Sequence, residues 1–201
     1  MRPVFIQFSL LFFSILYFST SIYAESAADY VGKIHLDIVI SIKENQSIYK
    51  ENPEKFLEAI SKPLEPLVDF NRISKNVMGK YYKISTQTQR DNFQKAFRAS
   101  LLNTYSKTLA EFQDEEIIVF PETKKSSKSN KEKVYLEIVT STKVYPAEYD
   151  MYLSNQGEWK LLNIIINGVN LGLAFRNQFY SLMKSENGDL DKVIEKWTSS
   201  I

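Results

Sequence analysis

Few side chains in this sequence have the types and spacing that enzymes use for catalysis. The 201 residues include a single histidine, His35, and no cysteine. This composition excludes a Ser-His-Asp or Cys-His arrangement and a histidine-rich metal site. It also excludes disulfides and thiolate metal sites. No glycine-rich phosphate loop follows a strand pattern. The sequence does not exclude a catalytic carboxylate pair, because Asp and Glu are plentiful and the two members of such a pair come together only in the folded structure.

One apolar stretch instead suggests ligand binding. It reads EWKLLNIIINGVN and covers residues 158–170. A strand with one wet face alternates apolar and polar side chains, but Leu161 and Leu162, then Ile164, Ile165 and Ile166, place aliphatic groups on both faces. Either a two-sided core encloses this strand, or one face packs on protein and the other lines a cavity that an apolar ligand fills.

Helical periodicity and capping residues predict the elements that position this strand. Asn52 followed by Pro53 starts one helix, and Asp69 starts another that Gly79 ends. The predicted helices cover residues 27–43, 53–60, 70–78, 87–112, 171–184 and 190–201. His35 falls in the first of these helices, where a lone histidine is usually a surface or boundary residue.

Alternating apolar residues predict four strands, at 115–120, 133–142, 147–154 and 158–167. Residues 155–157 form a tight turn, and the one long connection is PETKKSSKSNKEK, residues 121–133. Helices, then a meander of strands, then helices predict an α+β domain with an antiparallel sheet.

The N-terminal residues are typical of a secretory signal peptide. Arg2 precedes an apolar run that ends at Ala24, a small residue suited to cleavage. A retained membrane anchor is the alternative. Cleavage leaves residues 25–201 as a single domain, with 24 basic against 24 acidic side chains once Arg2 is removed. A neutral domain argues against a nucleic-acid partner.

A lysine-rich segment stands out in the predicted loop. It contains Lys124, Lys125, Lys128, Lys131 and Lys133. Such a run can contact anionic lipid head groups, but a solvated loop tip is the more common explanation.

Two long stretches carry a resemblance to a known family. The first is PLVDFNRISKNVMGKYYKISTQTQRDNFQKAFRASLLNTYSKTL, residues 66–109, and the second is WKLLNIIINGVNLGLAFRNQFYSLMKSENGDLDKVIEKW, residues 159–197. Their aromatic, aliphatic and glycine positions, among them Trp159, Gly168 and Arg176, resemble the MlaC family, also called the toluene-tolerance auxiliary family. The chain departs from the family pattern at Asn163, where Asp is common, and at Asn170, where Ser is common.

This resemblance implies a periplasmic phospholipid-binding protein of Gram-negative bacteria. Such a carrier shuttles glycerophospholipid between an outer-membrane lipoprotein complex and the substrate-binding subunit of an inner-membrane ABC transporter, which maintains outer-membrane lipid asymmetry. The implied fold is a curved four-stranded antiparallel meander packed against N-terminal and C-terminal helices around an apolar pocket. A monomer is expected, with bound phospholipid as cargo and no catalytic residue, metal or cofactor.

The resemblance also suggests residues that line the acyl pocket, drawn from several elements. The candidates are Val77, Met78, Tyr81, Phe97, Leu101, Tyr105, Ile138, Val139, Tyr149, Met151, Trp159, Ile164 and Ile166. Ordinary core packing is the alternative for each of them. Arg90 and Arg176 accompany the family motifs and would either meet a phosphate or form structural ion pairs.

Two other functions remain open. An NTF2-like enzyme, or an apolar small-molecule binder in the same cavity, would use Tyr81, Tyr82 or Tyr105 beside an Asp to polarise a substrate carbonyl. A protein adaptor with a fully packed core would hold no ligand.

Overall fold

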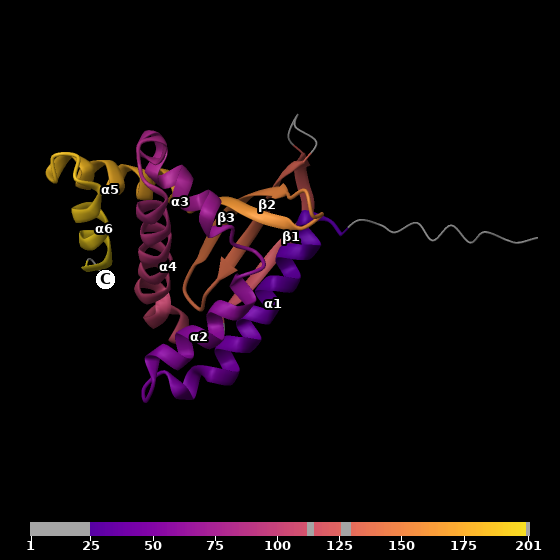
Figure 1. Cartoon of the computed structure of the whole chain (residues 1–201). Helices are drawn as coiled ribbons and strands as arrows, with labels where there is room; N and C mark the ends of the chain where they lie inside the picture. The colour runs from indigo at the N-terminus through magenta and orange to yellow at the C-terminus, as the bar shows by residue number, and fades with distance from the viewer. Residues whose placement is uncertain (1–24, 112–114, 126–129, 200–201) are drawn as a thin grey trace, which may run out of the picture.

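A computed structural model describes residues 25–111, 115–125 and 130–199 (Figure 1). The predicted signal peptide, residues 1–24, lies outside the described residues. The helices are α1 (Ala27–Asn45), α2 (Pro53–Leu64), α3 (Phe70–Met78), α4 (Gln87–Ala110), α5 (Leu171–Ser185) and α6 (Leu190–Ser199), with short 3-10 helices η1 (Gln46–Ile48) and η2 (Gly79–Lys83). The strands are β1 (Glu116–Lys125), β2 (Lys131–Val139), β3 (Val144–Leu153), β4 (Trp159–Ile166) and β5 (Val169–Asn170).

Side-chain caps fix the starts of the short helices, as the sequence predicts. Asn52 Oδ1 accepts from the Lys55 backbone N–H at 3.0 Å, and Asp69 Oδ1 accepts from the Arg72 N–H at 2.9 Å. Each cap satisfies a backbone donor that has no partner inside the helix. Gly79 ends α3 with φ of 55°, in the left-handed region that glycine adopts without a Cβ clash.

All five strands pair antiparallel, in the order β1-β2-β3-β4-β5. The predicted meander is therefore confirmed, and a two-residue β5 extends it. The predicted long loop at 121–133 is wrong in its bounds, because β1 runs on to Lys125 and β2 begins at Lys131. The β1 register shifts between Val119 and Thr123, around Pro121, which has no N–H to donate to the ladder.

The two faces of the sheet differ in what covers them. On the first face, Val134, Leu136, Tyr149, Met151 and Leu161 are buried. They join the inward residues of α1 and α2 in a hydrophobic core that we call cluster 1. Helix α1 packs on β1 and β2, and α2 packs on α1. The second face carries the alternate residues, among them Lys133, Tyr135, Glu148, Asp150 and Asn163.

A second core, cluster 2, lies among the remaining helices. It contains Phe93 and Phe97 of α4, Phe179 of α5 and Trp197 of α6, all with at most 2 % of their surface exposed. Phe93 and Phe179 meet edge to face with ring centroids 4.8 Å apart, a favourable geometry for aromatic pairs. Figure 1 shows α4, α5 and α6 gathered on one side of the molecule, with α1 on the other.

Three connections hold the sheet and the helices of the two clusters together. Helix α4 reaches from cluster 2 to cluster 1, where Ala110 is buried. The Leu161 N–H donates to the Leu67 carbonyl at 2.8 Å, which ties the segment before α3 to β4. Asn163 Oδ1 on β4 accepts from the Gly172 N–H of α5 at 3.0 Å. Within the described ranges, no helix has the length and apolar character that crossing a bilayer requires.

Candidate ligand-binding site

Strand β4 is enclosed from both sides, which answers the question raised by its sequence. Leu161, Ile164 and Ile166 belong to cluster 1 or pack against it on the first face. Ile165 pairs with Glu148 and points to the second face, and helices α3 and α5 contact β4. Among these aliphatic residues only Leu161 is fully buried. The strand is therefore covered on both faces but leaves apolar surface partly open.

Burial differs among the first-face residues. Val134, Met151 and Leu161 have at most 4 % of their surface exposed, and Ala147, which pairs with Ile166, has 3 %. Ile117 and Ile138, which pair near the β2–β3 turn, and Ile164 and Ile166 of β4 are only half-buried. We call this half-buried set, Ile117, Ile138, Ile164 and Ile166, the open end of the first face. An apolar surface that protein covers only in part is suited to an apolar ligand.

The predicted wall residues are divided between the two clusters. Val77, Met78 and Phe97 are buried in cluster 2, with Tyr81 and Leu101 packed against it; Tyr149, Met151 and Trp159 are buried in cluster 1, with Ile138, Ile164 and Ile166 packed against it. Val139 belongs to neither cluster. Tyr105 lies in α4, but its side chain is outside the described residues. The structure thus separates the predicted wall residues into two groups, one in each cluster.

Strand alternation separates two of these candidates further. Ile138 and Val139 are consecutive in β2, so their side chains point to opposite faces. A wall built from one face of the sheet can hold only one of them. Ile117 of β1 pairs with Ile138 and shares its half-buried position on the first face, but it was not among the predicted candidates, although the alternation of 115–120 placed it in a strand. Knowing which face it occupied required the β1–β2 register.

Tyr149 of cluster 1 contacts the half-buried ring of His35. The rings of His35 and Tyr149 are 5.5 Å apart between centroids. His35 is half-buried, which agrees with the expected surface or boundary position, and both of its ring nitrogens are buried and have no hydrogen-bond partner. Burial lowers the pKa of His35 to about 4 and raises the pKa of Tyr149. At neutral pH both groups are therefore uncharged, as an apolar environment requires.

Arg90 and Arg176 bond to neutral partners. Arg90 donates to Ser85 through Nε to Oγ at 3.1 Å and through Nη2 to the carbonyl at 2.9 Å. Arg176 Nε donates to the Asn76 carbonyl at 2.8 Å. Within the part of the chain that the structure describes, neither arginine forms an ion pair. Their hydrogen bonds fix local backbone geometry.

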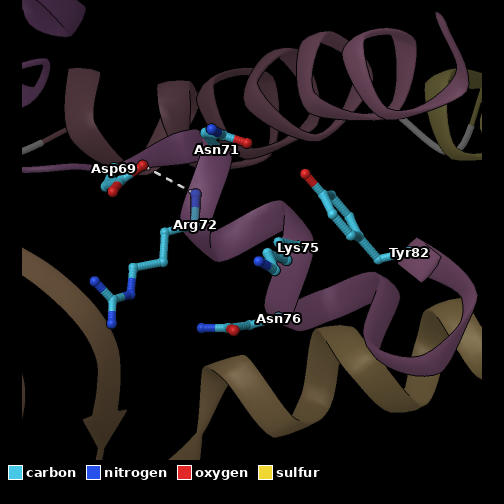
Figure 2. A pocket seen from close by; sticks show the side chains of 6 residues that line it. All are labelled: Asp69, Asn71, Arg72, Lys75, Asn76 and Tyr82. Atoms are coloured by element: carbon cyan, nitrogen blue, oxygen red, sulfur yellow. Dashed lines mark hydrogen bonds between the residues drawn. The ribbon is translucent and has the colours of Figure 1, made fainter. Parts of the chain in front are cut away.

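The second face carries a groove that differs in character from the open end of the first face. It has a volume of about 560 Å³ and lies where α3, the β1–β2 hairpin, β3 and β4 meet. Its lining residues are Arg72, Asn76, Lys124, Lys131, Glu132, Lys133, Asp150, Met151, Leu162 and Asn163. A neighbouring pocket of about 360 Å³ shares Arg72 and Asn76 (Figure 2). Lys124, Lys131 and Lys133 of the predicted loop are thus strand residues beside a groove.

The second face carries charged side chains that form ion pairs. No group of three or more His, Asp or Glu side chains among the described residues could hold a metal ion. Lys133 Nζ lies 2.7 Å from Glu148 and 3.2 Å from Asp150. Its hydrogen bond to Glu148 is the main cause that raises the pKa of Lys133. Lys133 therefore stays protonated, and the two carboxylates balance its positive charge within the second face.

The fold and these surfaces define an α+β protein that has an antiparallel sheet and two hydrophobic cores. The chain belongs to the MlaC protein family, whose model matches residues 34–199. It is 34% identical over 180 residues to the toluene tolerance protein ttg2D of Pseudomonas putida, covering 89% of this chain and 82% of that protein.

One further relative and one protein of similar fold have names that mention phospholipid. The intermembrane phospholipid transport system binding protein MlaC of Haemophilus influenzae is 26% identical over 135 residues, which cover 65% of this chain and 62% of that protein. A phospholipid-binding protein from Ralstonia solanacearum, solved in complex with a phospholipid, has a similar fold. Its TM-score is 0.75 at 21% identity, with 86% of this chain and 98% of that chain covered.

Proposed function

We propose that this protein is a periplasmic phospholipid carrier that holds acyl chains against the open end of the first face. The observation that carries the proposal is the half-burial of Ile138, Ile164 and Ile166 at the end of an otherwise buried apolar face. Membership of the MlaC family, and the phospholipid that the Haemophilus and Ralstonia proteins are named for, support a phospholipid as the ligand.

Shielding acyl chains from water supplies a large gross free energy. Two chains contain about 30 methylenes, and each is worth roughly 0.8 kcal/mol on burial, which gives about 20 kcal/mol. Release into water is therefore negligible. A bilayer offers equivalent shelter, so exchange between protein and membrane is close to neutral. The direction of transport then comes from the partner complexes.

The half-buried wall candidates are the residues placed to meet a ligand directly. At the open end of the first face these are Ile138, Ile164 and Ile166, with the buried Tyr149 beside Ile164 on the neighbouring strand, whereas Tyr81 and Leu101 pack on cluster 2 and Val139 lies on the second face. Val77, Met78, Phe97 and Met151 have at most 1 % of their surface exposed. Protein already surrounds them, so acyl contact would require the clusters to separate.

The proposed cellular route follows from family membership. The protein is exported by residues 1–24, cleaved after Ala24, and acts as a monomer in the periplasm. It receives and delivers phospholipid at an outer-membrane lipoprotein complex and at the substrate-binding subunit of an inner-membrane ABC transporter. Glu25, the residue after the proposed cleavage point, supplies the carbonyl that accepts from Trp159 Nε1 at 2.9 Å, so the start of the proposed mature chain is held against β4.

The enzyme alternative needs a titratable carboxylate in the apolar region. Among the described residues, the fully buried polar side chains are Ser61, Ser74 and Ser85. A carrier needs no catalytic group, and we propose that this protein performs no chemistry on its ligand.

Native mass spectrometry tests the proposal. We expect the protein, expressed from the full sequence and purified without detergent, to carry a stoichiometric adduct that organic extraction identifies as phospholipid. The same spectrum gives the number of acyl chains bound. A bare protein mass with no extractable lipid, even after incubation with phospholipid vesicles, would contradict the carrier function and favour a protein adaptor.

A further inference from the structure

The groove on the second face is rich in cations that have no acidic partner. Arg72 comes from α3, and Lys124 and Lys131 come from the two strands of the β1–β2 hairpin. Within the described residues these three side chains form no ion pair. Lys133 differs, because Glu148 and Asp150 neutralise it. The groove therefore holds four cationic side chains against two acidic ones, Glu132 and Asp150, and the three cations unpaired among the described residues come from α3, β1 and β2.

Arg72 is held in position by aromatic stacking. Its guanidinium carbon lies 3.9 Å from the centroid of the Tyr152 ring, and Tyr152 in turn donates its hydroxyl to Asp69 Oδ2 at 2.6 Å. Burial, assisted by this hydrogen bond, raises the pKa of Tyr152, so the ring stays a neutral donor. Stacking engages the guanidinium face and leaves its edge N–H groups available for an anion.

Figure 2 shows how the polar side chains of α3 are arranged. Arg72 and Asn76 extend in the same direction from the helix, with Arg72 reaching toward a neighbouring strand, whereas Tyr82 lies apart from them. Arg72 and Asn76 are one helical turn apart, so they share a face. This pairing offers guanidinium and amide N–H donors to a single ligand group.

The groove also has an apolar part. Leu162, which is half-buried, lines it beside the cations, whereas the side chain of the other apolar lining residue, Met151, is buried on the first face. An acidic peptide would leave such a floor without a matching group, whereas a phospholipid presents a phosphate joined to an apolar glycerol ester region. Positive side chains above an apolar floor therefore fit lipid better than protein.

We propose that this groove binds the phosphate of an anionic phospholipid head group at a membrane surface, with Arg72, Asn76 and Lys131 as its donors. The site is distinct from the proposed acyl site, because the two lie on opposite faces of the same sheet. The groove would bring the protein to a bilayer, while the open end of the first face carries the cargo.

Vesicle flotation tests this proposal. Wild-type protein should bind vesicles that contain phosphatidylglycerol and not vesicles of phosphatidylcholine alone, with weaker binding as salt rises. Arg72→Gln combined with Lys131→Gln should lower the partition coefficient roughly thirtyfold, since each basic residue near an anionic surface is worth about 1 kcal/mol. Melting temperatures and lipid loading, measured on the same samples, report folding and the acyl site independently.

A matched control removes two charges elsewhere. Lys33 and Lys95 are exposed on α1 and α4, so Lys33→Gln with Lys95→Gln should weaken binding less than about threefold. Equal losses in both double variants would show that net charge alone attracts the protein, which overturns the groove as a site. Arg72→Lys keeps the charge but loses the planar fork, and full retention of binding by this variant would also overturn the assignment.

Two competitors identify the source of the anion. In the first case, inorganic phosphate shifts the Arg72 and Asn76 NMR signals but wild-type protein does not bind anionic vesicles. This result would reassign the groove to a soluble phosphate. A poly-glutamate peptide that binds where vesicles do not would reassign it to an acidic protein partner. Either result overturns the membrane proposal. Loss of vesicle binding with normal phospholipid loading would leave the carrier function intact.

Discussion

His35 shows how one residue can make the stability of this protein depend on pH. Its ring lies against Tyr149, with both nitrogens buried and without partners. In the folded protein its pKa is about 4, against an ordinary value of 6.5. The neutral ring is tolerated beside cluster 1, but a charged ring would lose its hydration without gaining a hydrogen bond or an acidic neighbour.

The sign of the pH effect follows from proton binding. Between pH 6.5 and about 4, the unfolded chain binds a proton at His35 that the folded protein does not. We therefore expect the free energy of unfolding to fall as pH drops through this window, by on the order of 3 kcal/mol in total. His35→Leu should remove this component. Urea unfolding of lipid-free protein at pH 7 and pH 5 measures it, and an equal pH response in wild type and variant would contradict the assignment.

At the scale of the element, β-strand alternation decides which residues can share a cavity. Ile166 lies on the first face, where it pairs with Ala147. Val139 lies on the second face, where it pairs with Val144, which has 52% of its surface exposed. The two residues were predicted to line one pocket, but their side chains point away from each other. They form a matched pair for testing which face of the sheet meets lipid.

Ile166→Trp should reduce phospholipid loading, because the larger ring fills the space at the open end of the first face. Val139→Trp should leave loading unchanged, since the added ring projects beside an exposed neighbour. Native mass spectra of both variants measure the bound fraction, and circular dichroism checks that each remains folded. Loss of loading in the Val139 variant alone would place the acyl chains on the second face.

At the scale of the whole molecule, two hydrophobic clusters share one chain. Each cluster holds one of the two tryptophans, with Trp159 in cluster 1 and Trp197 in cluster 2. Helix α4 contributes to both, and the side chains of Tyr152 and Asp69 join β3 to the start of α3. These connections couple the clusters, which supports the interpretation of residues 25–201 as a single domain.

The tryptophans allow this coupling to be measured. Trp159→Phe and Trp197→Phe each leave one tryptophan as a fluorescent reporter of one cluster. In each variant we expect the fluorescence transition to coincide with the circular dichroism transition, because α4 cannot unfold in one cluster without disturbing the other. Urea titration followed by both signals tests this. A fluorescence transition separated from that of the backbone in either variant would show that the clusters unfold as independent units.

Local signals in the sequence predicted most of the fold. The Asn52 and Asp69 caps and the Gly79 terminus depend on residues within one turn, and the structure has all three. The strand alternation predicted the meander in the same way. The hairpin bounds were wrong because Pro121 and the lysines read as a loop, while the β1–β2 ladder continues past the register shift. Cross-strand pairing there outweighs local propensity.

The sequence by itself determined that this chain has apolar surface on both faces of β4, no cysteine or histidine-based catalytic centre, and the motif order of its family. Only the tertiary structure decided how the wall candidates divide between two clusters, that the nitrogens of His35 are buried, and that Arg72 meets Lys124 and Lys131 in one groove. The physical reason is that helix periods and caps are local, whereas burial and charge convergence depend on contacts between residues far apart in the chain.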